Sequence, residues 1–152
     1  MVDKLIHEQR WTVFLSHSSK DKPFVDWLYE KLCSSELLAW YDKFEILVGD
    51  SIIARIEEGL NGSELLIVVI SQASVKSTWV NAELQPKILQ QIQKQRIDVL
   101  PIVLGKAKPE EVSIFLADKR WIQFPRKGSD DKFQELLSSI EGHLKRRGLL
   151  DI

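Results

Sequence analysis

The sequence has very little cysteine and no long apolar run. One cysteine, Cys33, stands among 152 residues, so no disulfide can form within the chain, and a reducing compartment is the default for such a protein. No stretch approaches the ~20 apolar residues that a membrane-spanning helix needs. The first ten residues alternate charged and apolar side chains, unlike the apolar core of a secretory signal. These absences predict a cytoplasmic protein without a membrane segment.

The chain also lacks an excess of either charge. Lysine and arginine total 21 against 22 acidic residues, which leaves a formal net charge of −1. Near-neutrality argues against bulk attraction to nucleic acid or to an anionic membrane, so neither is an expected partner. The basic run at residues 145–147 is explained by the end of a helix, where cations are favoured. The length and a hydrophobic content of 44% predict one compact domain.

Several common catalytic and cofactor motifs are missing. The sequence contains no GxGxxG, GxxxxGK[ST] or HExxH, so a Rossmann dinucleotide turn, P-loop hydrolysis and zincin chemistry lose their support. Three scattered histidines and one cysteine predict no metal site. Cys33 lies beside Leu32 on an expected helix, and we predict a buried structural thiol. His17 ends an expected strand, where either a site role or a plain loop position is open.

Short apolar runs alternate with longer amphipathic stretches. Residues 65–70 are uninterrupted and apolar, as in a strand covered on both faces. Strict strand–helix alternation predicts a parallel sheet with helices on both faces and ligands near the carboxyl ends of the strands. The expected strands are 11–15, 37–41, 65–70, 99–104 and 121–124; the expected helices are 21–35, 50–60, 77–94, 109–116 and 131–146.

Local chemistry along these elements leaves alternatives open. Asp21 is predicted to cap the first helix, with Pro23 tolerated in its first turn. Trp79 and Glu83 are four residues apart and share one helix face. Ordinary packing on the protein surface is enough to explain that spacing. Helix capping and solvation are likewise enough to explain Asp42, Glu45 and Asp50. Four other tryptophans are predicted to pack within the fold: Trp11, Trp27, Trp40 and Trp121.

Four segments in order resemble a known family. They are VFLSHSSKD at 13–21, WYDKFE at 40–45 with VGDSI at 48–52, LIVVIS at 66–71 with STWVNAEL at 77–84, and VLPIV at 99–103. Together they resemble the TIR domain (Toll/interleukin-1 receptor/resistance protein) over roughly residues 10–146. The resemblance implies a flavodoxin-like α/β fold, with five parallel strands in the order 2-1-3-4-5 and helices on both faces. Residues 10–147 would form the domain, between an N-terminal tail at 1–9 and a C-terminal tail at 148–152 that could lead into a further module.

The resemblance implies two kinds of function. Some members of the family are scaffolds that signal by TIR–TIR contact, and others cleave the nicotinamide–ribose bond of NAD+. Glu83 matches the catalytic glutamate of the enzymatic members. We therefore expect an NAD+ glycohydrolase or cyclase, activated by self-association, in immune or antiphage defence signalling; a non-catalytic interaction module is the alternative. A receiver-like module, suggested by the fold class alone, is disfavoured because the first loop lacks an acidic cluster.

A carboxylate suits this chemistry. Nicotinamide leaves NAD+ as a neutral base, so no general acid is needed, and Glu83 would stabilise the oxocarbenium-like ribose. NAD+ is thus expected as a substrate, with no cofactor. The implied substrate-binding residues are Ser16, His17, Ser18, Lys20, Asp42, Phe44, Glu45 and Trp79. Enzymes of the family often carry arginine or lysine in the first loop for the diphosphate, a role left here to Lys20 or His17.

The same resemblance implies a partner. The segment Val48, Gly49, Asp50 and Ser51 belongs to the BB loop, which mediates head-to-tail contact between TIR domains in this family. Such a contact continues into filaments or open arrays unless it closes into a ring. Other TIR domains are therefore the expected protein partners, and activity is expected mainly in the clustered state.

Overall fold

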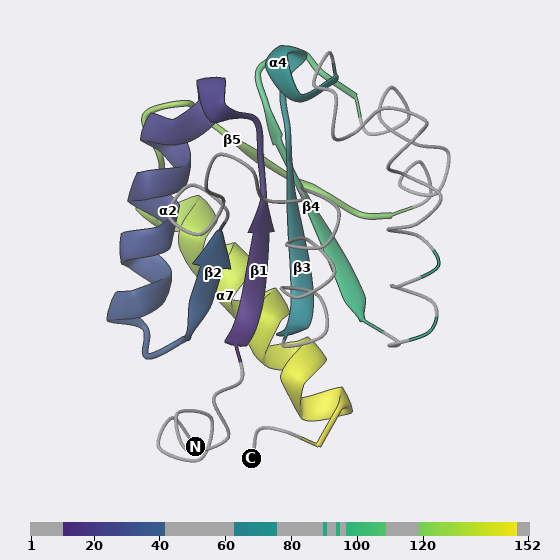
Figure 1. The fold of residues 1–152 in the computed structure, drawn as a ribbon. Helices are drawn as coiled ribbons and strands as arrows, with labels where there is room; N and C mark the ends of the chain where they lie inside the picture. The colour runs from purple at the N-terminus through teal and green to yellow at the C-terminus, as the bar shows by residue number, and fades with distance from the viewer. Residues whose placement is uncertain are drawn as a thin grey trace, which may run out of the picture.

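The structure is a computed structural model, and it describes residues 11–41, 63–75, 90, 94, 97–108 and 119–148. These residues form a five-stranded sheet in the order β2-β1-β3-β4-β5, with every pair parallel (Figure 1). The predicted α/β class with a parallel sheet is confirmed. The strands are β1 (Trp11–Ser16), β2 (Ala39–Tyr41), β3 (Ser63–Ile70), β4 (Asp98–Leu104) and β5 (Ile122–Phe124).

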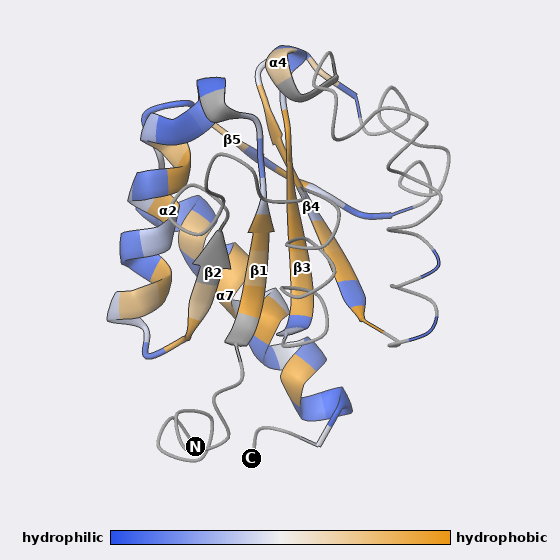
Figure 2. Cartoon of the chain, viewed as in Figure 1, coloured by the Kyte–Doolittle hydropathy of each residue, from blue (hydrophilic) through white to orange (hydrophobic). Residues whose placement is uncertain are grey.

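The sheet is buried on both faces. All eight residues of β3 are buried, as the uninterrupted apolar run predicts (Figure 2). In β1, Val13 and Leu15 point to one face and Phe14 to the other, because successive side chains alternate along a strand. All three are at most 2% exposed. Both faces of a parallel sheet are usually buried, because the crossover connections between parallel strands place helices over them.

Two helices pack against the same face of the sheet. Helix α2 (Lys22–Ser34) follows a 3-10 turn, η1 (Ser19–Asp21), and helix α7 (Asp130–Arg146) ends the described chain. Their apolar stripes join one core cluster with the odd-numbered residues of β1 and β3 (Figure 2). The buried helical residues are Phe24, Val25, Leu28, Leu32, Phe133, Leu136, Ile140 and Leu144. The predicted periodicity of residues 131–146 is confirmed.

Trp27 joins the two helices to β5. Its ring lies 6.1 Å from that of Phe124 and 6.4 Å from that of Phe133, both in edge-on geometry. Gly128, in the turn before α7, has φ +86° and lies against the indole, so closely that a Cβ would stand 2.5 Å from a ring carbon. The packing of Trp27 that the sequence predicts is confirmed.

An ion pair closes the amino edge of the sheet. Arg147, just after α7, places Nη2 3.0 Å from the Oε2 of Glu64 in β3. The Glu64 side chain is only 3% exposed, and the Arg147 side chain is 24% exposed. This ion pair links the residue that follows α7 to the start of β3, a central strand of the sheet.

Three predictions about single residues are wrong. Asp21 lies at the N-cap of α2 but makes no side-chain capping bond, although Pro23 does stand in the first turn. Cys33 is exposed, because it follows the buried Leu32 by one residue and so points away from the core. Trp121 is 47% exposed, because it precedes the short strand β5 instead of packing within it.

Other predictions fall outside the described residues. These are the helices at 50–60 and 109–116, the helix at 77–94 apart from two isolated positions, and Trp79. The burial of the Trp11 and Trp40 side chains is likewise not described. A four-residue helix, α4 (Gln72–Val75), follows β3 where a loop is predicted. Among the residues that are described, no helix is long and apolar enough to cross a membrane.

Candidate functional site at the carboxyl edge

Loops from β1, β3 and β5 meet at the carboxyl edge of the sheet, where parallel α/β folds bind ligands (Figure 1). The first loop contributes Ser16, His17 and Ser18, which are 2%, 5% and 7% exposed. Lys20, two residues further on, is exposed. The structure therefore brings these four predicted site residues together on one edge, three of them sealed from solvent.

A tight turn fixes the first loop. The Ser18 carbonyl accepts a hydrogen bond from the Asp21 backbone N–H at 2.9 Å, and the Ser18 hydroxyl accepts one from the Lys20 N–H at 3.3 Å. A serine side chain that bonds the backbone two residues later stabilises such turns. The bonds of Ser18 shape the path from β1 into α2.

The Asp21 carboxylate lies beneath this loop and binds two distant residues. Ser71 donates its hydroxyl to Asp21 Oδ2 at 2.5 Å, and Arg126 Nη1 donates to Oδ1 at 3.1 Å. The Asp21 side chain is 0% exposed and that of Arg126 is 56% exposed. Burying a carboxylate is costly unless it is paired and hydrogen-bonded. Both conditions are met here, by one residue after β3 and one after β5.

Ser16 carries a buried polar atom that no described residue satisfies. Its Oγ is buried and has no hydrogen-bond partner within the part of the chain that the structure describes. Ser16 is paired in register with Val68 of β3 and, by alternation, shares the face of Phe14. An unsatisfied buried hydroxyl costs about 1–3 kcal/mol. Such atoms are uncommon in folded proteins and need an explanation, a functional role among them.

Sequence reasoning missed part of this edge. The sequence pattern includes Ser71 at the end of an apolar run and predicts Asp21 as a helix cap, but it does not indicate that Asp21 bonds Ser71 and Arg126. Ser71 directly follows an apolar strand, as Ser16 ends one, and Arg126 comes two residues after β5. The rule that ligands gather at carboxyl ends of strands marks both positions.

The remaining predicted site residues lie outside the described residues. They are Glu83, Asp42, Phe44, Glu45 and Trp79, together with the BB-loop residues Val48, Gly49, Asp50 and Ser51. In the described ranges, no group of three or more histidine, cysteine, aspartate or glutamate residues could hold a metal ion.

Similar proteins share both the sequence pattern and the fold. The chain is 36% identical over 115 residues to 2' cyclic ADP-D-ribose synthase BtTIR of Bacteroides thetaiotaomicron, covering 73% of this chain and 39% of that protein. It is 34% identical over 130 residues to NAD(+) hydrolase TcpA of Theionarchaea archaeon, covering 84% of this chain and 39% of that protein. The chain thus spans about two fifths of the length of these relatives.

Solved structures agree on the fold. The TIR domains of the activated Roq1 resistosome superpose with a TM-score of 0.66 at 21% identity, covering 86% of this chain and 99% of that chain. A metazoan TIR-STING receptor from C. gigas gives 0.67 at 19% identity, covering 86% of this chain and 39% of the receptor chain. The sequence profile of the TIR domain matches residues 13–137. The chain therefore belongs to the TIR domain family.

Proposed function

We propose that this chain cleaves the nicotinamide–ribose bond of NAD+, as a glycohydrolase or as a cyclase. The observation that carries the proposal is the pair of activities in the names of its relatives, NAD(+) hydrolase and 2' cyclic ADP-D-ribose synthase, at 33–36% identity. Both activities begin with the same bond cleavage. The carboxyl edge, with a buried polar loop and an exposed arginine, supports a small-molecule site there.

The proposed reaction needs one carboxylate. The bond between the ribose C1′ and the nicotinamide nitrogen breaks, and its electron pair neutralises the positive charge of the ring. Glu83 stabilises the oxocarbenium-like ribose that forms. Water, or a hydroxyl of the same molecule, adds to C1′ and loses a proton, which yields ADP-ribose or a cyclic isomer. NAD+ is the substrate in this scheme and no cofactor takes part.

The described part of the site contributes the first loop. We assign Ser16, His17, Ser18 and Lys20 to the substrate side of this edge, where the three buried residues shape the loop and Lys20 is exposed to a ligand. The family resemblance adds further substrate-binding residues: Asp42, Phe44, Glu45 and Trp79. NAD+ carries its negative charge on the diphosphate, and Lys20 is an exposed cation on the loop.

Self-association completes the proposal. Other TIR domains are the proposed partners, through the BB-loop residues Val48, Gly49, Asp50 and Ser51, and clustering raises activity. The full fold is proposed to be flavodoxin-like, with helices on both faces of the β2-β1-β3-β4-β5 sheet. The single cysteine and the lack of an apolar span favour a cytoplasmic role in immune or antiphage signalling. The resistosome likeness supports assembly.

The test is NAD+ consumption by the 152-residue chain, alone and clustered on a multivalent support. Wild type is expected to release nicotinamide, and Glu83→Gln to reduce the rate by about 100-fold or more. Glu141→Gln, an exposed carboxylate on α7, is the matched control and should keep full activity. Clustered wild-type protein that leaves NAD+ intact would instead assign the chain to a non-catalytic TIR–TIR scaffold. Full activity in Glu83→Gln would show that the catalytic residue is a different one.

A further inference from the structure

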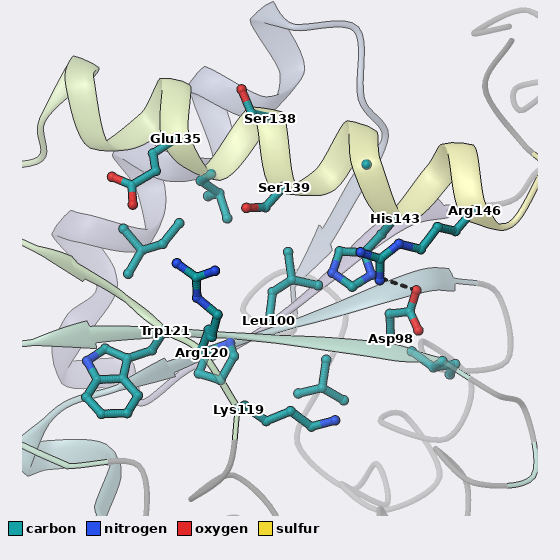
Figure 3. Close-up of a pocket in the computed structure, with 16 residues that line it drawn as sticks. Asp98, Leu100, Lys119, Arg120, Trp121, Glu135, Ser138, Ser139, His143 and Arg146 are labelled. Atoms are coloured by element: carbon teal, nitrogen blue, oxygen red, sulfur yellow. Dashed lines mark hydrogen bonds and ion pairs between the residues drawn. The ribbon is translucent and has the colours of Figure 1, made fainter. Parts of the chain in front are cut away.

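A groove of about 710 Å³ opens at the amino ends of β4 and β5, beside α7 (Figure 3). It exists because β5 is short: β5 pairs with β4 only along Ile102–Leu104, whereas β4 begins at Asp98. Helix α7 has 17 residues and is therefore about 25 Å long, so it extends past the start of β5. Within the described part of the chain, the amino-terminal half of β4 therefore lines the groove and has no partner strand on the β5 side.

This groove is separate from the candidate functional site. The strands are parallel, so the amino ends of β4 and β5 lie at the edge of the sheet opposite to the first loop. The seven residues of β4 separate the two edges by about 20 Å. Neither the first-loop residues nor the Asp21–Arg126 pair lines the groove.

Positive side chains outnumber negative ones in the wall of the groove. The charged residues there, apart from a histidine, are Lys119, Arg120, Arg146, Asp98 and Glu135. Asp98 is already engaged, because His143 Nδ1 lies 2.9 Å from its Oδ2. Glu135 accepts a hydrogen bond from Lys132 Nζ at 3.4 Å. Two of the three cations are arginines, Arg120 and Arg146, and the planar set of N–H donors on a guanidinium group matches the oxygens of a phosphate.

Trp121 gives the groove an aromatic surface. It is 47% exposed, and among the residues whose burial the structure describes it is the one large hydrophobic side chain exposed to this degree. Figure 3 shows the Trp121 indole at one end of the groove, directed away from α7, and the Arg120 side chain of the preceding residue extending toward α7. An accessible indole suits stacking of a planar base, which is how single nucleotides are commonly held, and Arg120 lines the same groove.

We propose that this groove is a second ligand site and that it binds a phosphorylated nucleotide. The base stacks on Trp121, Arg120 holds the nearest phosphate, and Arg146 lies farther along the groove for an additional one. The volume falls within the range usual for small-molecule sites. An acidic protein segment would meet the same cations, but it has no use for the exposed indole face. The proposal concerns binding only, and it does not rest on NAD+ cleavage.

The test follows the five tryptophan indole N–H signals of the whole chain in nitrogen–proton correlation spectra. AMP, adenosine and tripolyphosphate are titrated separately, and the signal of Trp121 is assigned by its loss in Trp121→Phe. AMP is expected to shift the Trp121 signal saturably, and adenosine or tripolyphosphate to bind about tenfold more weakly or worse. Arg120→Ala should weaken AMP binding by about tenfold or more. Lys127→Ala, which removes an exposed cation outside the groove, should leave it unchanged.

Three results would overturn the proposal. AMP could leave Trp121 unshifted, tripolyphosphate could bind as tightly as AMP, or polyglutamate could shift Trp121 while AMP does not. The third result would make the groove a protein-docking surface. Glu83→Gln separates nucleotide binding in the groove from NAD+ cleavage, because this variant is expected to bind AMP at Trp121 as wild type does, whether or not the chain consumes NAD+.

Discussion

Arg126 and Asp21 are 105 positions apart in the sequence, yet the guanidinium Nη1 donates to the Asp21 carboxylate at 3.1 Å. The second oxygen of the same carboxylate accepts from Ser71. One buried charge therefore joins the start of α2 to the residues that follow β3 and β5. The shape of the carboxyl edge depends on this charge being neutralised within the protein.

Removing Arg126 tests that dependence. Arg126→Ala leaves the buried Asp21 carboxylate with Ser71 but without its cation, and we expect a loss of about 1–3 kcal/mol in the free energy of unfolding. Lys127→Ala removes the neighbouring exposed cation and should stay within about 0.5 kcal/mol of wild type. Urea denaturation measures both. Equal stability of the two variants would mean that the ion pair contributes nothing.

The amino edge offers a second matched pair. Arg147→Ala removes the cation that pairs with the Glu64 carboxylate, whose side chain is 3% exposed, and the expected loss is about 3 kcal/mol. Arg146→Ala removes the adjacent, exposed arginine and is expected to change stability by about 0.5 kcal/mol or less. Thermal unfolding of the two proteins side by side distinguishes a buried pair from a general effect of lost charge.

Two glycines should respond in opposite directions to alanine. Gly128 has φ +86°, and a Cβ there would stand 2.5 Å from the Trp27 ring, so Gly128→Ala is expected to cost about 2–4 kcal/mol. Gly142 lies inside α7, where a Cβ meets no atom within 4 Å. Gly142→Ala should therefore stabilise the protein by about 0.5–1 kcal/mol. Calorimetry checks the sign of each change, and the same sign for both would contradict the local geometry.

The N-terminus of α7 depends on Ser129. Its backbone is extended and its side chain accepts a hydrogen bond from the Lys132 N–H. Ser129→Ala is expected to lower the unfolding free energy by about 1 kcal/mol, and Ser129→Asp to retain most of it. Ser138→Ala, at an exposed position in the middle of the same helix, is the control and should not destabilise. Denaturation midpoints for the three variants provide the measurement.

The exposure of Cys33 gives a chemical test. Because the thiol is exposed on α2, it should react with a thiol reagent in the native protein at a rate within about tenfold of that in the unfolded chain. A thiol inside the core would react only after unfolding. Protection of Cys33 in the folded state would therefore support the burial expected from sequence and contradict the structure.

Much of the fold follows from local pattern. The apolar run ending at Ile70 predicts a strand buried on both faces, and the spacing of Phe133, Leu136, Ile140 and Leu144 predicts the buried face of α7. Each signal is repeated over several residues and lies within a single element. The structure agrees with both. The same kind of pattern predicts Pro23 in the first turn of α2, where its missing N–H has no cost.

The errors arise where distant contacts outweigh local preference. Asp21 stands at the N-cap of α2, but its side chain bonds Arg126 and Ser71 instead of the helix backbone. Both partners are distant in the sequence, so the residues near Asp21 do not predict them. Trp121 is exposed because β5 begins only at the next residue, Ile122. The apolar and aromatic residues at 121–124 predict a strand, but they do not show where it begins. The carboxyl-end rule points to the loop that begins at Ser16, because it needs only the end of one strand. Completing the site requires knowing which other loops reach that edge.

Pro101 has a consequence for how this sheet meets other chains. It pairs in register with Val68 of β3 and comes one residue before β5 begins to pair, at Ile102. Proline has no backbone N–H, and it is tolerated in a sheet where one side of its strand is unpaired. Among the described strands, Pro101 therefore stands where β4 pairs only with β3, and it supplies no backbone N–H to a strand on either side. A strand that lacks one donor is a poorer template for strand-by-strand growth into aggregates.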